Sequence, residues 1–253
     1  MKDTELATEK LFLDKVNAAY TVNDSLQTKE MRKLIVRTFS PFLKNGRGLE
    51  LGCSDGYMTS MLSRHVSFLD VVDGSELFLK EARERTITEQ IDNISFINSL
   101  FEEFSPRKKY DYVIASYIME HVLHPVDVLR MAYDALKDDG LLFVVVPNAN
   151  ALSRQLAMHM GMYEHLKVLT ANDLKHGHRR VYDRTSLNKD IEQAGFENIA
   201  QGGLMLKILA DFQMDKLIEE GILGQDQIDG LYKLGLEYPD LCGSLFSVCR
   251  KKE

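Results

Sequence analysis

Apolar and polar residues alternate along the chain in two distinct patterns. Short apolar runs, which predict strands, lie at 48–53, 68–75, 94–99, 110–116, 141–148 and 244–252. Segments whose apolar residues recur every three or four positions, which predict helices, lie at 56–65, 76–86, 125–140 and 184–196. Strands and helices that alternate in this order indicate an α/β fold with an open, doubly wound, mostly parallel sheet.

The segment 125–140 carries the clearest helical signal. Pro125 lies at its start, Gly140 lies at its end, and an apolar stripe runs along it to Leu136. The run that follows, 141–148, is apolar at successive positions. Such a run fits a strand that is buried on both faces of a parallel sheet.

The alternation divides the chain into four stretches. We expect an N-terminal helical segment at 1–45, a ligand-binding core at 46–150, a helical lid insertion at 151–182, and the C-terminal part of the sheet at 183–253, with a second helical insertion at about 208–240. The two insertions are set apart because they interrupt the alternation of strands and helices.

Composition narrows the class of protein. The chain has 253 residues, of which 45% are hydrophobic and 27% charged, and this is ordinary for a globular α/β domain with insertions. A net charge of −7 disfavours a sequence-blind nucleic-acid binder. No apolar run reaches the roughly 18 residues of a membrane span. The N-terminus lacks the apolar core of a signal peptide, and the three cysteines (Cys53, Cys242 and Cys249) show no metal spacing, so we expect a cytoplasmic protein.

The first predicted strand enters a turn of small residues that contains two acids. Ligands of open parallel sheets bind at the carboxyl ends of the strands. At that end the turn offers Glu50, Gly52, Cys53, Ser54, Asp55 and Gly56. The second strand ends at Asp73, whose carboxylate can accept both hydroxyls of a ribose. The two strand ends together therefore predict a nucleoside site.

A dinucleotide is the alternative ligand for such a turn. Its fingerprint G-x-G-x-x-G, started at Gly52, requires glycine where this sequence has Ser54 and Tyr57. Glu50 and Asp55 would repel a pyrophosphate, and the chain contains no G-K-[ST] of a P-loop. Acids beside a tight turn instead favour a nucleoside with a cationic tail and no phosphate, such as S-adenosylmethionine.

Five motifs resemble those of class I S-adenosylmethionine-dependent methyltransferases of the small-molecule type. They are "LELGCSDG" (49–56), "VVDGSE" (71–76), "FINSLFEEF" (96–104), "YDYVIASYIMEHVLHP" (110–125) and "LKDDGLLFVVVPN" (136–148), in the order and spacing of that family. The resemblance implies a Rossmann-like, seven-stranded sheet and an S-adenosylmethionine-binding core at 46–150. It also implies a methyltransferase activity.

The resemblance also assigns roles to particular residues. The turn with Glu50, Gly52, Ser54 and Gly56 would bind the methionine part, and Asp73 would hold the ribose. The other implied cofactor contacts are Gly74 and Ser75 at the border of the adenine, Leu100, Phe101 and Glu102 along its edge, and Ser116 and Tyr117 under the transferring methyl.

Ser54 and Leu100 depart from the pattern of the family, and the roles of Asp73 and Cys53 have an alternative interpretation. Ser54 replaces the family's more common middle glycine, which is tolerable if φ there is negative, and Leu100 stands where an aspartate often contacts the adenine amine. Asp73 could instead cap the following helix. For Cys53, which lies in the cofactor turn, we expect a small buried residue rather than a nucleophile, because no His–Asp pair accompanies it in sequence.

The insertion at 151–182 is the part of the chain that we expect to meet the acceptor. It is rich in methionine, tyrosine and histidine and carries five cations, namely Arg154, Lys167, Lys175, Arg179 and Arg180. One interpretation is a solvated helical cap. The other is a lid that closes over the acceptor and binds an anionic metabolite, such as a nucleotide-sugar or a precursor of a surface polysaccharide.

Two histidines are candidates for the group that removes a proton from the acceptor. His121 follows the fourth strand, and His178 lies in the insertion. An unperturbed imidazole titrates near 6.5, which suits this task at neutral pH. "IMEHV" also resembles a stretch of quinone-biosynthesis O-methyltransferases in which two glutamates and a histidine bind a divalent ion. Glu120 and His121 match, but the third position is Tyr117, so we expect no metal and keep Glu120 and His121 only as an alternative.

The function predicted from the sequence is methyl transfer from S-adenosylmethionine to a small molecule, with oxygen favoured over nitrogen as the accepting atom. Two alternatives stay open: a protein that binds the cofactor without catalysis, and a dinucleotide-dependent enzyme on the same architecture. The expected partner is a small-molecule acceptor rather than a nucleic acid or a membrane, and a homodimer is compatible with the sequence.

Overall fold

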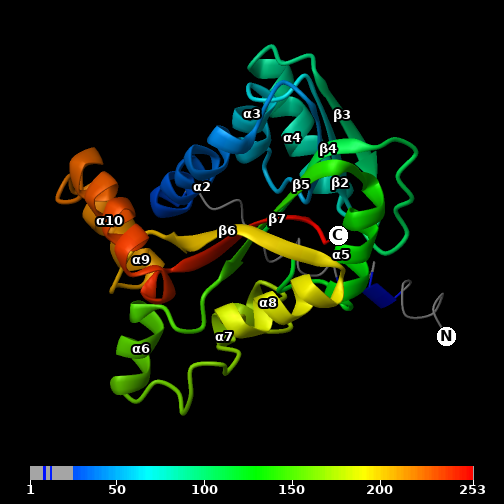
Figure 1. The fold of residues 1–253 in the computed structure, drawn as a ribbon. Coiled ribbons are helices and arrows are strands. Elements are labelled where there is room, and N and C mark those ends of the chain that lie inside the picture. The colour runs from blue at the N-terminus through cyan, green and yellow to red at the C-terminus, as the bar shows by residue number, and fades with distance from the viewer. Residues whose placement is uncertain (1–7, 10–11, 13–24, 253) are drawn as a thin grey trace.

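A seven-stranded sheet forms the centre of the protein in a computed structural model that describes residues 8, 9, 12 and 25–252 (Figure 1). The strand order is β3-β2-β1-β4-β5-β7-β6. The strands are β1 (Arg47–Leu51), β2 (Phe68–Asp73), β3 (Ile94–Asn98), β4 (Tyr110–Ser116), β5 (Leu136–Pro147), β6 (Phe196–Leu204) and β7 (Ser244–Lys251). The first five are parallel, and β7 runs antiparallel to both β5 and β6. The predicted doubly wound, mostly parallel sheet is confirmed.

Helices cover both faces of this sheet. One face carries α2 (Leu26–Phe39), α3 (Tyr57–Ser63), α4 (Glu76–Thr88) and α10 (Gln225–Glu237), whose apolar residues pack with Ile114 and Phe143. The other face carries α5 (Pro125–Ala135) and α8 (Arg184–Gln193), which pack with Val113 and Val144. Neighbouring residues of β4 and β5 thus point to opposite cores, which explains why the run 141–148 is apolar at successive positions.

The helix predicted at 125–140 ends earlier than expected, so that boundary is wrong. Leu136 already has extended backbone angles (φ −73°, ψ 147°) and pairs with Tyr110 as the first residue of β5. Its side chain is fully buried, and its carbonyl accepts a hydrogen bond from Lys251 Nζ at 2.9 Å. Burial and strand pairing therefore override the apolar stripe that suggested helix.

The strand β6 has no counterpart among the runs read from the sequence. Its residues, FENIAQGGL, mix polar and apolar side chains because β6 lies at the edge of the sheet and is only partly buried. Gly195, with φ of +91°, separates it from α8, so the helix predicted to 196 ends at Gln193.

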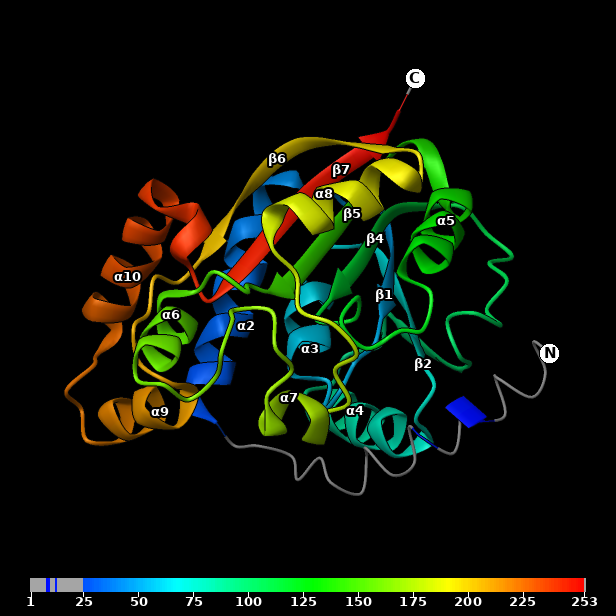
Figure 2. The ribbon, with the colours of Figure 1, turned by 90° about the horizontal axis from the view of Figure 1, so that it is seen from below.

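Within residues 25–252, four helices belong to the two insertions that interrupt the alternation. The stretch 151–182 contains α6 (Leu152–His159) and α7 (Ala171–Lys175), and the stretch 208–240 contains α9 (Asp211–Glu219) together with α10. Figure 2 shows α6, α7 and α9 gathered past the ends of the central strands, on the same side of the molecule as the start of α3. The expected N-terminal helical segment at 1–45 contains α2, while most of residues 1–24 lie outside the described part.

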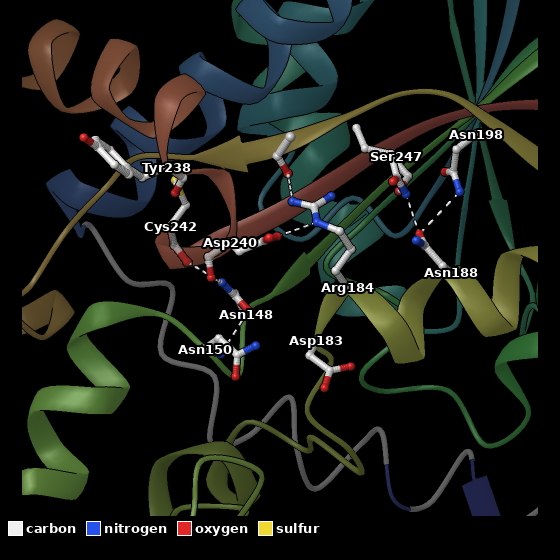
Figure 3. Close-up of polar contacts among 12 residues, drawn as sticks. Asn148, Asn150, Asp183, Arg184, Asn188, Asn198, Tyr238, Asp240, Cys242 and Ser247 are labelled. Atoms are coloured by element: carbon white, nitrogen blue, oxygen red, sulfur yellow. Dashed lines mark hydrogen bonds and ion pairs between the residues drawn. The ribbon is translucent and has the colours of Figure 1, made fainter.

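The second insertion is fastened to the end of β5 by one buried amide. Asn148 Nδ2 donates to the carbonyls of Asp240 and Cys242 at 2.8 and 2.9 Å, and Arg184 at the start of α8 forms an ion pair with Asp240 (Figure 3). Gly243 N–H also donates to the carbonyl of Met205 at 3.0 Å. These bonds fix the segment that leads into β7 beside the carboxyl ends of the parallel strands.

Among residues 8, 9, 12 and 25–252, no helix is both long and apolar enough to cross a bilayer.

Candidate active site

A cavity of about 1660 Å³ lies at the carboxyl ends of β1, β2 and β4, between the sheet and the insertions. Its walls contain the turn after β1, the end of β2, the start of α2, and parts of α6, α7 and α9. Pockets for one ligand usually measure about 300–1,000 Å³. The cavity therefore has room for a cofactor and a second molecule.

Two glycines shape the turn after β1, but only the first reaches the cavity. Gly52 has φ of +77°, and a Cβ there would lie 2.3 Å from Ile118 Cδ1. Gly56 has φ of +76°, and its Cβ would lie 2.7 Å from the backbone of Ala82 in α4. Gly52 lines the cavity, whereas the predicted cofactor residue Gly56 serves the packing of the turn against α4.

Ser54 departs from what the sequence analysis required of it. Its φ is +48°, in the left-handed region, whereas we expected a negative φ for a residue that replaces glycine. Arg32 Nη2 of α2 donates to Ser54 Oγ at 3.3 Å. The turn thus holds a conformation that costs a non-glycine residue about 1–2 kcal/mol, as turns that contact a ligand often do.

Asp55 lines the cavity but does not offer a free charge to a ligand. Its Oδ1 accepts from Arg32 Nη1 at 2.6 Å, and its Oδ2 accepts from Arg85 Nη2 at 3.1 Å. Arg85 also donates to the carbonyl of Asp55 at 2.8 Å. This buried carboxylate ties the turn to α2 and α4, so its effect on a ligand is through the position of the turn.

Asp73 lies at the end of β2 with both carboxylate oxygens engaged by backbone. Oδ2 accepts from Cys53 N–H at 3.0 Å, and Oδ1 accepts from Ser75 N–H at 2.8 Å. The cap of α4 is Ser75, whose hydroxyl accepts from Phe78 N–H, so Asp73 is not the helix cap. Each oxygen of Asp73 keeps a lone pair that can accept a hydroxyl from the cavity.

Cys53 is buried, as expected for a small packing residue. Burial and the neighbouring Asp73 raise the pKa of its thiol, so it stays protonated. Such a thiol is not a nucleophile.

Glu50 is a buried carboxylate whose two oxygens have no hydrogen-bond partner in the described part of the chain. It is 1% exposed, lines the cavity, and neither of its oxygens accepts a hydrogen bond. Burial raises its pKa to about 8. An unpaired buried carboxylate is costly, and a cationic ligand group in the cavity would relieve that cost. The site therefore fits the ammonium of S-adenosylmethionine.

The other predicted cofactor residues also line the cavity; they are Gly74, Ser75, Leu100, Phe101, Glu102, Ser116 and Tyr117. Ser116 Oγ is buried without a partner among the described residues and is free to bond a ligand. Tyr117 has φ of +57°, and its hydroxyl lies 2.7 Å from Ser244 Oγ, so β7 helps to fix it.

Three titratable side chains meet where the lid insertion contacts the loop after β4. The imidazoles of His121 and His178 pack edge to face with centroids 4.7 Å apart. Glu120 lies beside them, 1% exposed and with both oxygens unpaired in the described part, and one ligand-type atom from each of the three residues lies within 4.8 Å of the others. All three residues line the cavity.

The two histidines of this cluster differ in their electrostatic surroundings. Burial, and next the neighbouring His178, lower the pKa of His121 to about 3, so His121 holds a proton poorly. His178 Nδ1 lies 3.3 Å from Asp173 Oδ1, an arrangement that leaves Nε2 facing away from the carboxylate. Burial raises the pKa of Glu120 to about 7, which is close to the ordinary working pH of a proton acceptor.

Two arginines hold the insertion onto the loop after β4. Arg179 Nε donates to the carbonyl of His121 at 2.7 Å, and Arg180 Nη1 donates to the carbonyls of Met119 and Val122 at 2.7 and 2.5 Å. Arg179 also pairs with Glu9 at 2.6 Å. These contacts place His178 against Glu120, and they engage two of the cations that we expected to face an acceptor.

Two more of the expected acceptor cations are engaged within the protein. Arg154 donates to the carbonyl of Val168 and pairs with Asp173, and Lys167 pairs with Asp183. The cations of the insertion thus mainly hold the insertion together.

Sequence reasoning missed four residues of this site: Arg32, Arg85, Asp173 and Lys207. Arg32 and Arg85 lie on α2 and α4, and nothing in the sequence of these helices indicates that their side chains bind Asp55. Asp173 is part of a capping box with Thr170, and the sequence T-x-x-D could have revealed it.

Comparisons with known proteins agree with this geometry. A family model described as "Methyltransferase domain" matches residues 24–201. The ubiquinone biosynthesis O-methyltransferase of Neisseria meningitidis serogroup C (strain 053442) is 25% identical over 177 residues, which cover 66% of this chain and 71% of that protein.

Solved structures of methyltransferases share the fold. The 1,6-didemethyltoxoflavin-N1-methyltransferase of Burkholderia thailandensis, with its substrate and S-adenosylhomocysteine bound, has a TM-score of 0.64 at 13% identity, over 100% of this chain and 90% of that chain. The N-methyltransferase NodS of Bradyrhizobium japonicum WM9, in complex with S-adenosylhomocysteine, has a TM-score of 0.59 at 14% identity, over 92% of each chain.

The family model covers well over half of the 253 residues, and the sheet order and cavity are those expected of the same class. A dinucleotide-dependent enzyme is thereby set aside. The chain belongs to the methyltransferase domain family and is a class I S-adenosylmethionine-dependent methyltransferase.

Proposed function

We propose that this enzyme methylates a hydroxyl oxygen of a small-molecule acceptor, and that His178, oriented by Asp173, accepts the hydroxyl proton. The observation that carries the proposal is the cluster of Glu120, His121 and His178 in the wall of the cavity. A proton acceptor is needed for a neutral hydroxyl and much less for an amine, whose lone pair is already available.

The proton path follows from the contacts within the cluster. With Nδ1–H of His178 directed at Asp173, Nε2 is free to take a proton from a hydroxyl in the cavity. The carboxylate of Glu120 would then stabilise the imidazolium, because the two groups interact electrostatically. His121, whose pKa is about 3, would stay neutral, so of the two histidines that the sequence offers, with His121 as the stronger candidate there, we assign the base to His178.

The cofactor would lie across the turn after β1. Glu50 would pair with the ammonium of the methionine, Asp73 with the ribose hydroxyls, and Ser116 and Tyr117 would lie near the methyl. The cofactor supplies an activated methyl on sulfur, and the chain contributes alignment of the acceptor with the carbon–sulfur bond.

Oxygen as the accepting atom is supported by sequence relatives. The curated relative named above and two further ones, from Neisseria meningitidis and Dinoroseobacter shibae, are ubiquinone biosynthesis O-methyltransferases at 25–27% identity. We therefore propose a phenolic hydroxyl, as in a catechol, as the first acceptor chemistry to examine. A protein that binds the cofactor without catalysis is the alternative.

A divalent metal is the second candidate for the role of the cluster. The orphaned carboxylate of Glu120 and two imidazoles within 4.8 Å form a donor set that fits such an ion. The third ligand that seemed missing at Tyr117 would be His178, which lies 57 residues beyond His121 in sequence. A bound ion would lower the pKa of an acceptor hydroxyl, and the low pKa of His121 suits a neutral ligand.

One assay tests the reaction and separates the two roles. Purified protein, before and after exhaustive chelation, is incubated with methyl-labelled S-adenosylmethionine and 3,4-dihydroxybenzoate, catechol or an aromatic amine, and products are identified by mass spectrometry. We expect O-methylated product, with turnover after chelation within about twofold of the untreated protein. Loss of activity that only added divalent ion restores would assign the cluster to metal binding. Absence of transfer to any hydroxyl, with transfer to the amine, would contradict O-methylation.

The unpaired Glu50 predicts proton release when the cofactor binds. With a pKa of about 8 in the free protein, Glu50 is largely protonated at pH 7, and an ammonium beside it favours the ionised form. Binding of S-adenosylhomocysteine at pH 7 should release close to one proton, and affinity should rise from pH 6 to 8 and then level off. Calorimetry in buffers of different ionisation enthalpy measures the release.

Two variants check the assignment to Glu50. Glu50→Gln should abolish both the proton release and the rise in affinity, whereas Glu84→Gln, on the exposed surface of α4, should keep both. Equal proton release in Glu50→Gln and the unaltered protein would show that another group titrates.

A further inference from the structure

Lys207 is unusual among the cations of this protein because it is buried in the wall of the cavity. Within the described residues it is the one basic side chain that is less than a tenth exposed, at 8%. It lines the same cavity as the cofactor turn and the cluster of Glu120, His121 and His178. A buried ammonium without good partners is costly, so its place calls for a specific partner.

The backbone around Lys207 holds its side chain in place. A Cβ on Gly243 would lie 2.9 Å from Lys207 Cε, so the stem runs directly across the glycine. Gly243 is itself fixed, because its N–H bonds to Met205 and the neighbouring Cys242 carbonyl accepts from Asn148. Figure 3 shows Asn148 and Cys242 in this anchor. The ammonium is therefore presented by a rigid wall.

Within the protein, Lys207 pairs with a carboxylate that an anionic ligand could displace. Lys207 Nζ forms an ion pair with Asp211, the first residue of α9, and the Asp211 side chain is 62% exposed. An exposed carboxylate gives up a contact to water at little cost. An anion inside the cavity could thus take the place of Asp211, which would turn outward.

Lys207 also packs against a segment that contacts Tyr117, the residue that we expect under the transferring methyl. The residue after Gly243 is Ser244, whose hydroxyl bonds the hydroxyl of Tyr117 at 2.7 Å, and Tyr117 directly follows β4. By contrast, four cations of the lid insertion (Arg154, Lys167, Arg179 and Arg180) are engaged by carbonyls or carboxylates elsewhere.

We propose that Lys207 binds an anionic group, a carboxylate or a phosphate, of the methyl acceptor and displaces Asp211. This inference rests on the proposed function, because it assigns the acceptor side of the cavity. It moves the recognition of an anionic acceptor from the lid insertion, where we expected it from the sequence, to the segment between β6 and α9.

Binding of three probes to protein saturated with S-adenosylhomocysteine tests the proposal. The probes are benzoate, phenyl phosphate and neutral benzamide, and affinities are measured by calorimetric titration. We expect at least one anion to bind roughly tenfold or more tightly than benzamide, since a hydrogen bond between charged groups has about this effect. Whichever anion binds more tightly identifies the carboxylate or the phosphate as the group recognised.

Substitutions of Lys207 and of Asp211 should change the affinity for the anions in opposite directions. Lys207→Met should remove the preference for the anions, whereas Asp211→Asn, which removes the internal competitor, should increase anion affinity several-fold. Lys216→Met removes a cation from the exposed surface of α9, outside the cavity, and should leave the preference unchanged. A merely structural ion pair would make Lys207→Met and Asp211→Asn equally harmful to stability and would give no gain in affinity.

The proposal is overturned if the unaltered protein shows no preference for either anion, or if the preference survives in Lys207→Met. Affinity for S-adenosylhomocysteine and the rate of methyl transfer are measured on the same preparations. A protein that methylates hydroxyls without preferring anions would refute the role of Lys207 alone. A protein that prefers anions but transfers no methyl would instead refute the proposed function.

Discussion

His178→Ala should lower turnover by at least about 10²-fold at saturating substrate while the affinity for S-adenosylhomocysteine stays within a few-fold. The reason is that in the proposed reaction Nε2 of His178 accepts the hydroxyl proton, and the contact of Nδ1 with Asp173 at 3.3 Å holds the ring in place. The cofactor contacts that we propose lie at the ends of β1, β2, β3 and β4 and do not include this side chain. Steady-state rates and calorimetry on the same preparation measure the two effects.

Three further variants make the result specific. His165→Ala removes an exposed histidine of the same insertion, outside the cavity, and should leave turnover unchanged. His121→Ala should cost less than His178→Ala, because an imidazole with a pKa of about 3 is a weak base. Glu120→Gln should lower turnover, and its combination with His178→Ala should cost little more than His178→Ala alone, as expected for groups that act as a unit.

A fall of less than about tenfold in both His178→Ala and His121→Ala would reject a general base in this enzyme. Methyl transfer would then rest on alignment alone, with an acceptor that is already ionised in solution. If both variants instead lose activity together with bound divalent ion, the metal assignment of the cluster would replace the base.

Asp73→Ala should weaken cofactor binding by about 2–4 kcal/mol, or roughly 30- to 1,000-fold, because two charge-assisted bonds to the ribose are lost and partly replaced by water. The structure adds a second contribution. Asp73 also accepts from Cys53 N–H and Ser75 N–H, so its removal loosens the turn after β1 as well as the ribose contact.

Asp73→Asn separates these two contributions. The amide oxygen can keep one backbone bond and one ribose bond, so its loss of affinity should lie between those of the unaltered protein and Asp73→Ala. Asp70→Asn is a control on the same strand, since Asp70 pairs with Arg47 away from the cavity. Calorimetry with S-adenosylhomocysteine measures affinity, and thermal unfolding checks that each variant is folded. Unchanged affinity in a folded Asp73→Ala protein would remove Asp73 from the ribose site.

The fastening of the lid insertion has a consequence for how the acceptor enters. Arg179 and Arg180 together donate hydrogen bonds to four backbone carbonyls in the loop after β4. The C-terminal end of the lid insertion is therefore held to that loop. Access to the cavity is therefore better provided between α6 and α9, where Met160 and Phe212 line the cavity and are 67% and 72% exposed.

Much of the fold followed from local sequence alone. Runs of β-branched and aliphatic residues predicted β1 to β5 and β7. All of these except the edge strand β3 lie inside the sheet, where a strand buries both faces and is apolar at successive positions. Small residues and acids at the end of β1, together with Asp73 at the end of β2, predicted the cofactor end of the cavity, because parallel strands bring their carboxyl ends to one edge.

Contacts between distant segments decided the rest. β6 escaped the sequence pattern because an edge strand needs no apolar run, and Asp55, which looked free in sequence, is held by Arg32 and Arg85 from two helices. Ser54 takes a left-handed conformation that its side chain does not favour, since the packing of the turn overrides the local preference.

The chemistry of the acceptor side is the clearest case of tertiary control. Glu120 and His178 are 58 positions apart in sequence, and no periodicity links them; the arginine contacts of the insertion bring them together. Burial then moves the pKa of Glu120 up to about 7 and that of His121 down to about 3. The sequence by itself determined which titratable residues were available near the fourth strand. Only the tertiary structure decided which of them can take a proton, because desolvation and neighbouring charges, unlike residue type, exist only after the chain has folded.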